Sequence, residues 1–134
     1  MVAKTLYLVR GVSGAGKTEF ARNLLDNMSS CAMFSADDYF DNGRNDWHWR
    51  KLEAAHTECR ENVHATMSMD IDHIFVCNTM VLEKELDEYY EIAAGFPEYR
   101  VVSLIIENRH NGQNVHGVPD KTCDKMRRRF QTKL

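Results

Sequence analysis

A glycine-rich segment that ends in lysine and threonine is the part of the sequence best suited to chemistry. It reads G-x-x-x-x-G-K-T, follows a short apolar run at 6–9 and precedes a helix-like run at 18–27. In this pattern backbone amides converge on phosphate oxygens at a helix amino terminus, the lysine reaches the outer phosphates, and the threonine holds Mg²⁺. A glycine-rich turn without a ligand is the alternative, and the lysine and threonine in register argue against it. We expect ATP and Mg²⁺ to bind at Gly11, Val12, Ser13, Gly14, Ala15, Gly16, Lys17, Thr18 and Glu19, with Lys17 also catalytic and Thr18 the metal ligand.

The carboxylate pair Asp37-Asp38 is the second candidate, because it directly follows a short predicted strand at 31–34. The carboxyl ends of parallel strands meet at one edge of a sheet, so this pair should lie near the phosphate loop. A carboxylate placed there can accept the proton of an attacking hydroxyl and align it with the γ-phosphate. On position alone, an Asp pair that caps a turn is an equally good interpretation.

The elements that must position these residues alternate along the chain. Apolar runs predict strands at 5–9, 31–34, 71–78 and 99–106, and 3.6-residue periodicity predicts helices at 18–27, 47–69 and 81–94, with a last helix from Pro119 onward. Asp46 is the expected N-cap of the long helix. This order predicts a single domain over 1–134, an α/β three-layer sandwich with a parallel sheet of four or five strands.

Composition limits the class of protein. Apolar residues make up 43% and charged residues 28% of the 134 residues, which is ordinary for a globular chain. A net charge of -3 gives no global attraction to nucleic acid, so such binding needs a local patch. The four cysteines are widely spaced, and the first apolar run is too short for a signal peptide or membrane span. We expect a cytoplasmic protein without membrane contact.

Two further features admit two interpretations each. Arg127-Arg128-Arg129 could line a groove for a nucleic-acid backbone, or could be cations favoured at a helix carboxyl terminus. Trp47 and Trp49 could stack on a base, and we take hydrophobic anchoring of the helix start as the default.

Several motifs, taken together, resemble a known kinase family. After the phosphate loop come S-A-D-D-Y-F at 35–40, V-C-N-T at 76–79, and N-V-H-G-V-P at 114–119 before a final helix. In this order they resemble the zeta-toxin-like P-loop kinases, in particular bacteriophage-type polynucleotide 5′-hydroxyl kinases and their animal kinase-like relatives. The resemblance covers 6–130 and implies a lid over the triphosphate at about 107–121, with Asp37 as the general base toward the acceptor hydroxyl.

Three positions depart from the family pattern. Phe40 stands where bacteriophage kinases carry an arginine that holds the acceptor phosphate, and Cys77 stands where strand three usually ends in Asp. Gln113 stands where the lid usually carries a basic residue; Arg109, or Arg127 among its neighbours, could substitute by charge and reach. The first hypothesis is an ATP-dependent, Mg²⁺-requiring phosphotransferase that acts on the 5′-hydroxyl of DNA or RNA. A nucleoside or small-molecule kinase, and an ATP-binding module that no longer turns over, are the alternatives.

Overall fold

Four parallel strands form the central sheet, in the order β2-β3-β1-β4. The computed structural model describes residues 3–41, 46–112 and 117–134. Within it β1 spans Lys4–Arg10, β2 Cys31–Phe34, β3 His73–Cys77 and β4 Tyr99–Ile105. β1 lies between β3 and β4, and Leu8 is in register with Val76 on one side and Ser103 on the other. All strands therefore end at the same edge of the sheet, as the sequence predicts.

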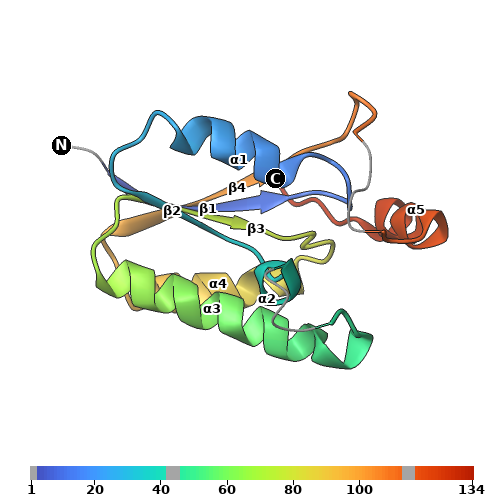
Figure 1. The fold of residues 1–134 in the computed structure, drawn as a ribbon. Coiled ribbons are helices and arrows are strands. Elements are labelled where there is room, and N and C mark those ends of the chain that lie inside the picture. The colour runs from blue at the N-terminus through green and yellow to red at the C-terminus, as the bar shows by residue number, and fades with distance from the viewer. Residues whose placement is uncertain (1–2, 42–45, 113–116) are drawn as a thin grey trace.

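Helices cover both faces of this sheet (Figure 1). α1 (Lys17–Leu25) lies on one face, and α3 (Leu52–Ser68) and α4 (Lys84–Ala94) lie on the other. The short α2 (Asp38–Asp41) and the 3₁₀ helix η1 (Trp49–Lys51) lie toward the carboxyl edge of the sheet, and α5 (Asp120–Arg129) lies beyond it. The α/β three-layer architecture with a four-stranded parallel sheet is thus confirmed.

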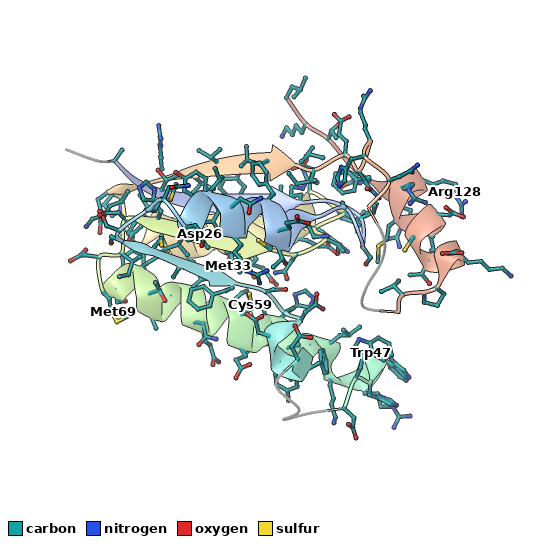
Figure 2. All side chains as sticks on the ribbon, turned by 45° about the horizontal axis from the view of Figure 1, so that its top comes forward. Asp26, Met33, Trp47, Cys59, Met69 and Arg128 are labelled. Carbon is teal, nitrogen blue, oxygen red and sulfur yellow. The ribbon has the colours of Figure 1, made fainter. Side chains whose placement is uncertain are left out.

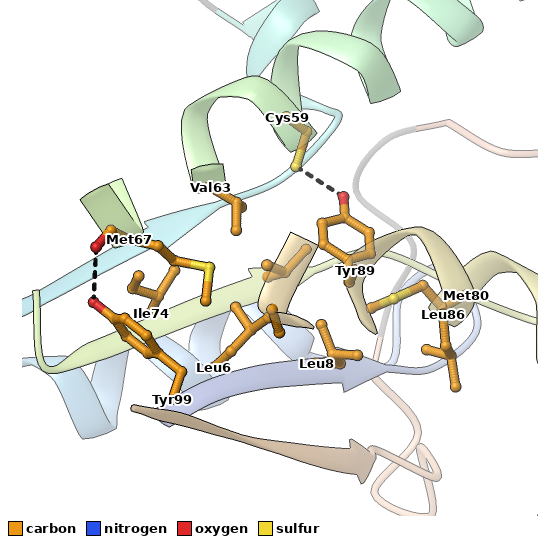
Figure 3. Close-up of a cluster of buried hydrophobic side chains, with 12 residues drawn as sticks. Leu6, Leu8, Cys59, Val63, Met67, Ile74, Met80, Leu86, Tyr89 and Tyr99 are labelled. Carbon is orange, nitrogen blue, oxygen red and sulfur yellow. Dashed lines mark hydrogen bonds between the residues drawn. The ribbon is translucent and has the colours of Figure 1, made fainter. Parts of the chain in front are cut away.

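Successive side chains of a strand point to opposite faces of the sheet, and this divides the core into two clusters. Leu6 and Leu8 of β1 point toward α3 and α4, where they pack with side chains of both helices (Figure 3). Val9 of β1 and Phe75 of β3 belong to the second cluster, on the face that α1 covers with Ala21. Because both faces of the two central strands, β1 and β3, are buried, these strands have nearly continuous apolar sequences, as strands of parallel sheets do. No helix in the described part of the chain is long and apolar enough to cross a membrane.

Three expectations about helix boundaries were wrong. The helix expected over 47–69 begins as η1 and continues as α3, and the cap is His48, whose Nδ1 accepts from the Arg50 amide, in place of Asp46. The helix expected from residue 81 begins at Lys84.

Candidate active site

The phosphate loop joins β1 to α1 in the geometry that the motif requires. Gly14 and Gly16 have φ values of 84° and 92°, a region that residues with a Cβ rarely adopt. At Gly11 the loop backbone runs close to Ile106: a Cβ at this position would lie 2.7 Å from the carbonyl oxygen of Ile106, so only glycine fits. The loop then enters α1 at Lys17, so the first amides of the helix face the loop. This backbone fits a chain of phosphates.

The two functional side chains of the motif lie at the start of α1. The Nζ atom of Lys17 donates to the carbonyl oxygens of Gly11 and Val12, both at 3.0 Å, so the ammonium is held inside the loop. Burial lowers the pKa of Lys17, and the negative charge of Asp37 opposes that effect. Thr18 follows directly and lines a cleft at the carboxyl edge of the sheet, whereas Glu19 is exposed.

The cleft beside Thr18 contains the carboxylate pair. It has a volume of about 230 Å³ and lies between α1 and the β2–α2 turn, with Thr18, Arg22, Met33, Phe34, Ser35, Asp37, Asp38 and Asp41 as its lining. The two carboxylates differ in role. Both line the cleft, but Asp38 Oδ2 accepts from the Ser35 amide at 3.0 Å, as in a capped turn, whereas Asp37 lies close enough to Lys17 to interact electrostatically. The structure therefore brings Asp37 and the phosphate loop to one cleft, as the sequence predicts.

A buried amide at the end of β3 holds the turn that carries Asp37. Asn78 Oδ1 accepts from the Ala36 amide at 2.8 Å and from Ser35 Oγ at 3.5 Å. Its Nδ2 donates to Tyr89 OH at 3.4 Å and to Cys59 Sγ at 3.8 Å, which connects the turn to α3 and α4. In the sequence this residue is only part of the V-C-N-T segment at 76–79, and the structure shows its hydrogen-bond partners.

Cys77 precedes this amide, at the position where the resemblance described above leads us to expect a carboxylate. Its thiol is buried beneath the start of α1, with Sγ 3.8 Å from the carbonyl oxygen of Lys17. Burial raises the pKa of Cys77 to about 12, so the side chain stays neutral and supplies no negative charge at the loop.

Arg22 is a cleft residue that the sequence analysis did not single out. It lies one helical turn after Thr18 on α1, so both side chains point to the same side, and both line the cleft with Asp37. Phe40, in contrast, makes an edge contact with Tyr39 and is absent from the lining of the cleft. The spacing of four residues from Thr18 was the available signal for Arg22.

The segment after β4 packs on the phosphate loop. A Cβ on Gly112 would lie 2.5 Å from the Gly14 carbonyl oxygen, and His110 Nε2 would lie 3.3 Å from a Cβ on Gly16. Arg109 points outward with 88% of its side chain exposed and pairs with Glu107. Gln113 lies outside the described residues, as do 114–116 of the expected lid at 107–121.

A clamp made by Arg10 fixes the chain after α5. The guanidinium is buried, with Nε donating to Met80 O at 2.9 Å and a terminal nitrogen donating to Gln131 O at 2.7 Å. It also stacks on the Phe130 ring at 4.8 Å. Met126 of α5 contacts the phosphate loop: its Sδ lies 3.9 Å from Ser13 Oγ. This contact places α5 beside the loop.

Arg127 of α5 is partly exposed and pairs with Asp124 one turn earlier, at 2.6 Å. That Arg109 or Arg127 substitutes for the basic residue expected at Gln113 stays a prediction.

A second hollow, of about 470 Å³, lies between α3 and α4 and includes Arg60, His64 and Glu88 in its lining. It is larger and more open than the Thr18 cleft, but no described residue of the phosphate loop or of the Asp37 turn lines it. We place the candidate active site at the smaller cleft for this reason.

No family model matches the chain. Human NEDD4-binding protein 2 is 26% identical over 138 residues, a match that covers 97% of this chain and 8% of that protein. The chain thus spans a small part of this relative.

Three solved structures are similar in fold. One is a chain of the Pnkp1/Rnl/Hen1 RNA repair complex, at 15% identity and a TM-score of 0.67, with 98% of this chain and 45% of that chain covered. Another is a sugar kinase from a Janibacter species, at 18% identity and a TM-score of 0.62, with 98% and 80% covered. The third is the APS kinase CysC of Mycobacterium tuberculosis in complex with AMPPNP and APS, at 16% identity and a TM-score of 0.50, with 93% and 69% covered. The chain has the fold of P-loop kinases.

Proposed function

We propose that this protein is an ATP-dependent phosphotransferase that moves the γ-phosphate of ATP to a hydroxyl group. The observation that carries the proposal is the single cleft that joins Thr18 of the phosphate loop to Asp37 at the end of β2. A donor phosphate held at the loop and an acceptor hydroxyl held at Asp37 would meet in this cleft. The kinases of similar fold, one of them with AMPPNP bound, support ATP as the donor.

Each residue has a defined part in the transfer. Loop amides and the Lys17 ammonium would bind the β- and γ-phosphates, and the Thr18 hydroxyl would hold Mg²⁺, which would supply positive charge to neutralise the phosphates. The acceptor oxygen bonds to the γ-phosphorus while the bond from that phosphorus to the β–γ bridging oxygen breaks. Asp37 takes the acceptor proton, and ADP leaves with the electron pair of the broken bond. Positioning and charge neutralisation supply most of the rate enhancement in such reactions.

The acceptor we propose is the 5′-hydroxyl of DNA or RNA. The motif resemblance supports it, as does the similarity to a chain of an RNA repair complex. Arg22 gives the cleft a cation beside Asp37, which would bind the phosphate that follows the terminal nucleoside. Arg22 would thus hold the acceptor phosphate, as the arginine at the position of Phe40 does in the bacteriophage kinases that the sequence resembles.

A small-molecule acceptor is the second candidate, and two observations favour it. The similar structures include a sugar kinase and an APS kinase. The cleft volume of about 230 Å³ is also below the usual range for ligand pockets, which favours a compact acceptor over a polynucleotide. A third possibility, an ATP-binding module without turnover, is favoured by the neutral Cys77 where related kinases have a carboxylate.

The experiment offers γ-labelled ATP and Mg²⁺ to the wild type with 5′-hydroxyl oligonucleotides, free nucleosides and simple sugars in separate reactions. Lys17→Ala and Asp37→Asn are run in parallel, with ATP affinity measured by calorimetry. Transfer to oligonucleotides that is lost in both variants, with ATP binding lost only in Lys17→Ala, is the expected result. Transfer to small molecules alone would establish the second candidate. ATP binding without transfer to any acceptor would contradict phosphotransfer and leave the binding module.

A further inference from the structure

Residues 47–51, which we call the aromatic tip, form an exposed cluster at the amino-terminal end of α3. Trp47 is 63% exposed and Trp49 is 62% exposed, so neither ring anchors the helix start. The default interpretation of the sequence for these tryptophans is therefore wrong. Between and after them come His48, Arg50 and Lys51, which place polar and cationic groups among the rings.

The aromatic tip has internal order although it is exposed. The His48 ring stacks on the Trp49 ring at 5.6 Å with an angle of 27° between the planes, and the Arg50 guanidinium lies 5.1 Å from the centre of the same ring. His48 Nδ1 also accepts from the Arg50 amide at 3.1 Å, which fixes the start of η1. Trp49 is thus presented in a set orientation, with less conformational freedom to lose when a ligand binds.

The aromatic tip lies on the acceptor side of the proposed active site. η1 continues directly into α3, and Figure 2 shows Trp47 at the end of the molecule where α2 lies. His56, further along α3, lies near enough to Asp37 for their charges to interact. From His56 back to Trp49 the helices advance by about 12 Å, at 1.5 Å per α-helical and 2.0 Å per 3₁₀ residue. At about 3.4 Å per stacked nucleotide this is the length of roughly four nucleotides.

We propose that the aromatic tip binds the bases and phosphates of a single-stranded nucleic acid, within the first few nucleotides of the acceptor 5′ end. The proposal rests on the proposed phosphotransfer to a polynucleotide and names how that acceptor is held. Exposed rings accept any base by stacking, and Arg50 and Lys51 supply the positive charge that the backbone requires. The chain as a whole carries a net charge of -3, so the attraction has to be local.

The test uses 5′-hydroxyl thymidylate oligonucleotides of two and eight nucleotides with a 3′ fluorophore, and anisotropy in the presence of a non-hydrolysable ATP analogue and Mg²⁺. The variants are W47A/W49A, W47F/W49F and, as a matched control, Tyr90→Ala, an exposed aromatic residue on α4. Stacking contributes roughly 5- to 100-fold in affinity per base. We expect W47A/W49A to weaken binding of the octanucleotide about 10- to 100-fold and to leave the dinucleotide unchanged. The phenylalanine pair should restore most of the affinity, and Tyr90→Ala should have no effect.

A second pair of variants tests the charges. R50Q/K51Q should lower the slope of log Kd against log salt concentration by about 0.7 for each phosphate that the protein no longer neutralises, while the length preference persists. Melting temperatures within experimental error of the wild type would show that the fold is intact.

The results separate this proposal from the proposed function. If oligonucleotides are phosphorylated but W47A/W49A binds both lengths as the wild type does, the aromatic tip serves another partner and the inference is overturned. If no acceptor is phosphorylated and the octanucleotide still binds through the two tryptophans, the inference stands and phosphotransfer is contradicted. Equal affinity of the wild type for the two lengths overturns the inference whatever the transfer assay shows.

Discussion

Replacing Asn78 by alanine tests whether the buried amide holds the turn that presents Asp37. The change leaves the Ala36 amide without its acceptor in a buried position, which costs roughly 1–3 kcal/mol. Removal of the bonds to Tyr89 and Cys59, together with the small cavity, adds about 1 kcal/mol. We expect the free energy of unfolding to fall by about 2–4 kcal/mol.

Urea unfolding followed by circular dichroism measures this change in stability. With a denaturant slope of about 1–3 kcal/mol per molar urea, a decrease of about 3 kcal/mol lowers the midpoint by roughly 1–3 M. Asn27→Ala is the matched control, because that side chain is exposed and makes one long bond to Asn23 O at 3.4 Å. The control should change stability by no more than about 0.5 kcal/mol. Tyr89→Phe keeps the Ala36 bond and should be less stable than the wild type by about 1 kcal/mol.

The same variant carries a second prediction, about function. Under conditions in which Asn78→Ala is folded, ATP affinity should match the wild type, because the phosphate loop is untouched, while the turnover number falls. Equal urea midpoints for Asn78→Ala and Asn27→Ala would refute the reasoning, since the amide bonds would then contribute nothing to the turn. A fall in ATP affinity as large as the fall in turnover would also contradict it.

Three further predictions follow from single interactions. Arg22→Gln should raise the KM for a nucleoside 3′-phosphate about 10-fold or more, because a charge-assisted bond to the phosphate is removed. The KM for the nucleoside itself should stay unchanged. Equal effects on the two acceptors in steady-state kinetics would refute this prediction. Gly112→Ala should lower stability by about 1–3 kcal/mol in thermal unfolding, because its Cβ would lie 2.5 Å from the Gly14 carbonyl oxygen. In the control Gly95→Ala the Cβ would lie at an ordinary contact distance of 3.4 Å from Ile92 O, so that change should be near neutral. Burial lowers the pKa of His56 below its ordinary value of 6.5, so the unfolded chain takes up a proton that the folded chain does not, and stability should fall as the pH drops below about 6.5. His56→Gln should flatten that part of the pH profile in urea titrations, and an unchanged profile would count against the assignment.

The sequence predicted what depends on local pattern. The phosphate loop, the order of strands and helices, and the position of Asp37 at a strand end follow from motif spacing and periodicity, and the structure places Thr18 and Asp37 in the lining of one cleft. Connections between parallel strands through a helix are short and right-handed, so few topologies are possible for a chain in which strands and helices alternate.

Long-range interactions could not be predicted in the same way. The strand order, in which β1 lies between β3 and β4, depends on which helices cover which face. The bonds of Asn78 to Ala36 cross 42 positions, and that of Arg10 to Gln131 crosses 121. No local pattern indicates such partners. The start of the long helix was misplaced for a local reason, because Asp46 is a better cap by residue type but the His48 ring makes the bond.

The Arg10 clamp makes the chain between β4 and Phe130 a segment with two fixed ends. One end is held by the pairing of β4 with β1, and the other is held by an arginine of the same β1. The entropy of such a closed segment changes slowly with its length, by about 0.6 kcal/mol for each doubling. Insertions that leave Gly112 packed on the phosphate loop should therefore cost little. Removal of Phe130 and Gln131, or Arg10→Leu, would abolish the contacts that hold the second end of this segment. The chain after β4 would then be fixed at one end only, and α5 would contact the phosphate loop as part of a flexible tail.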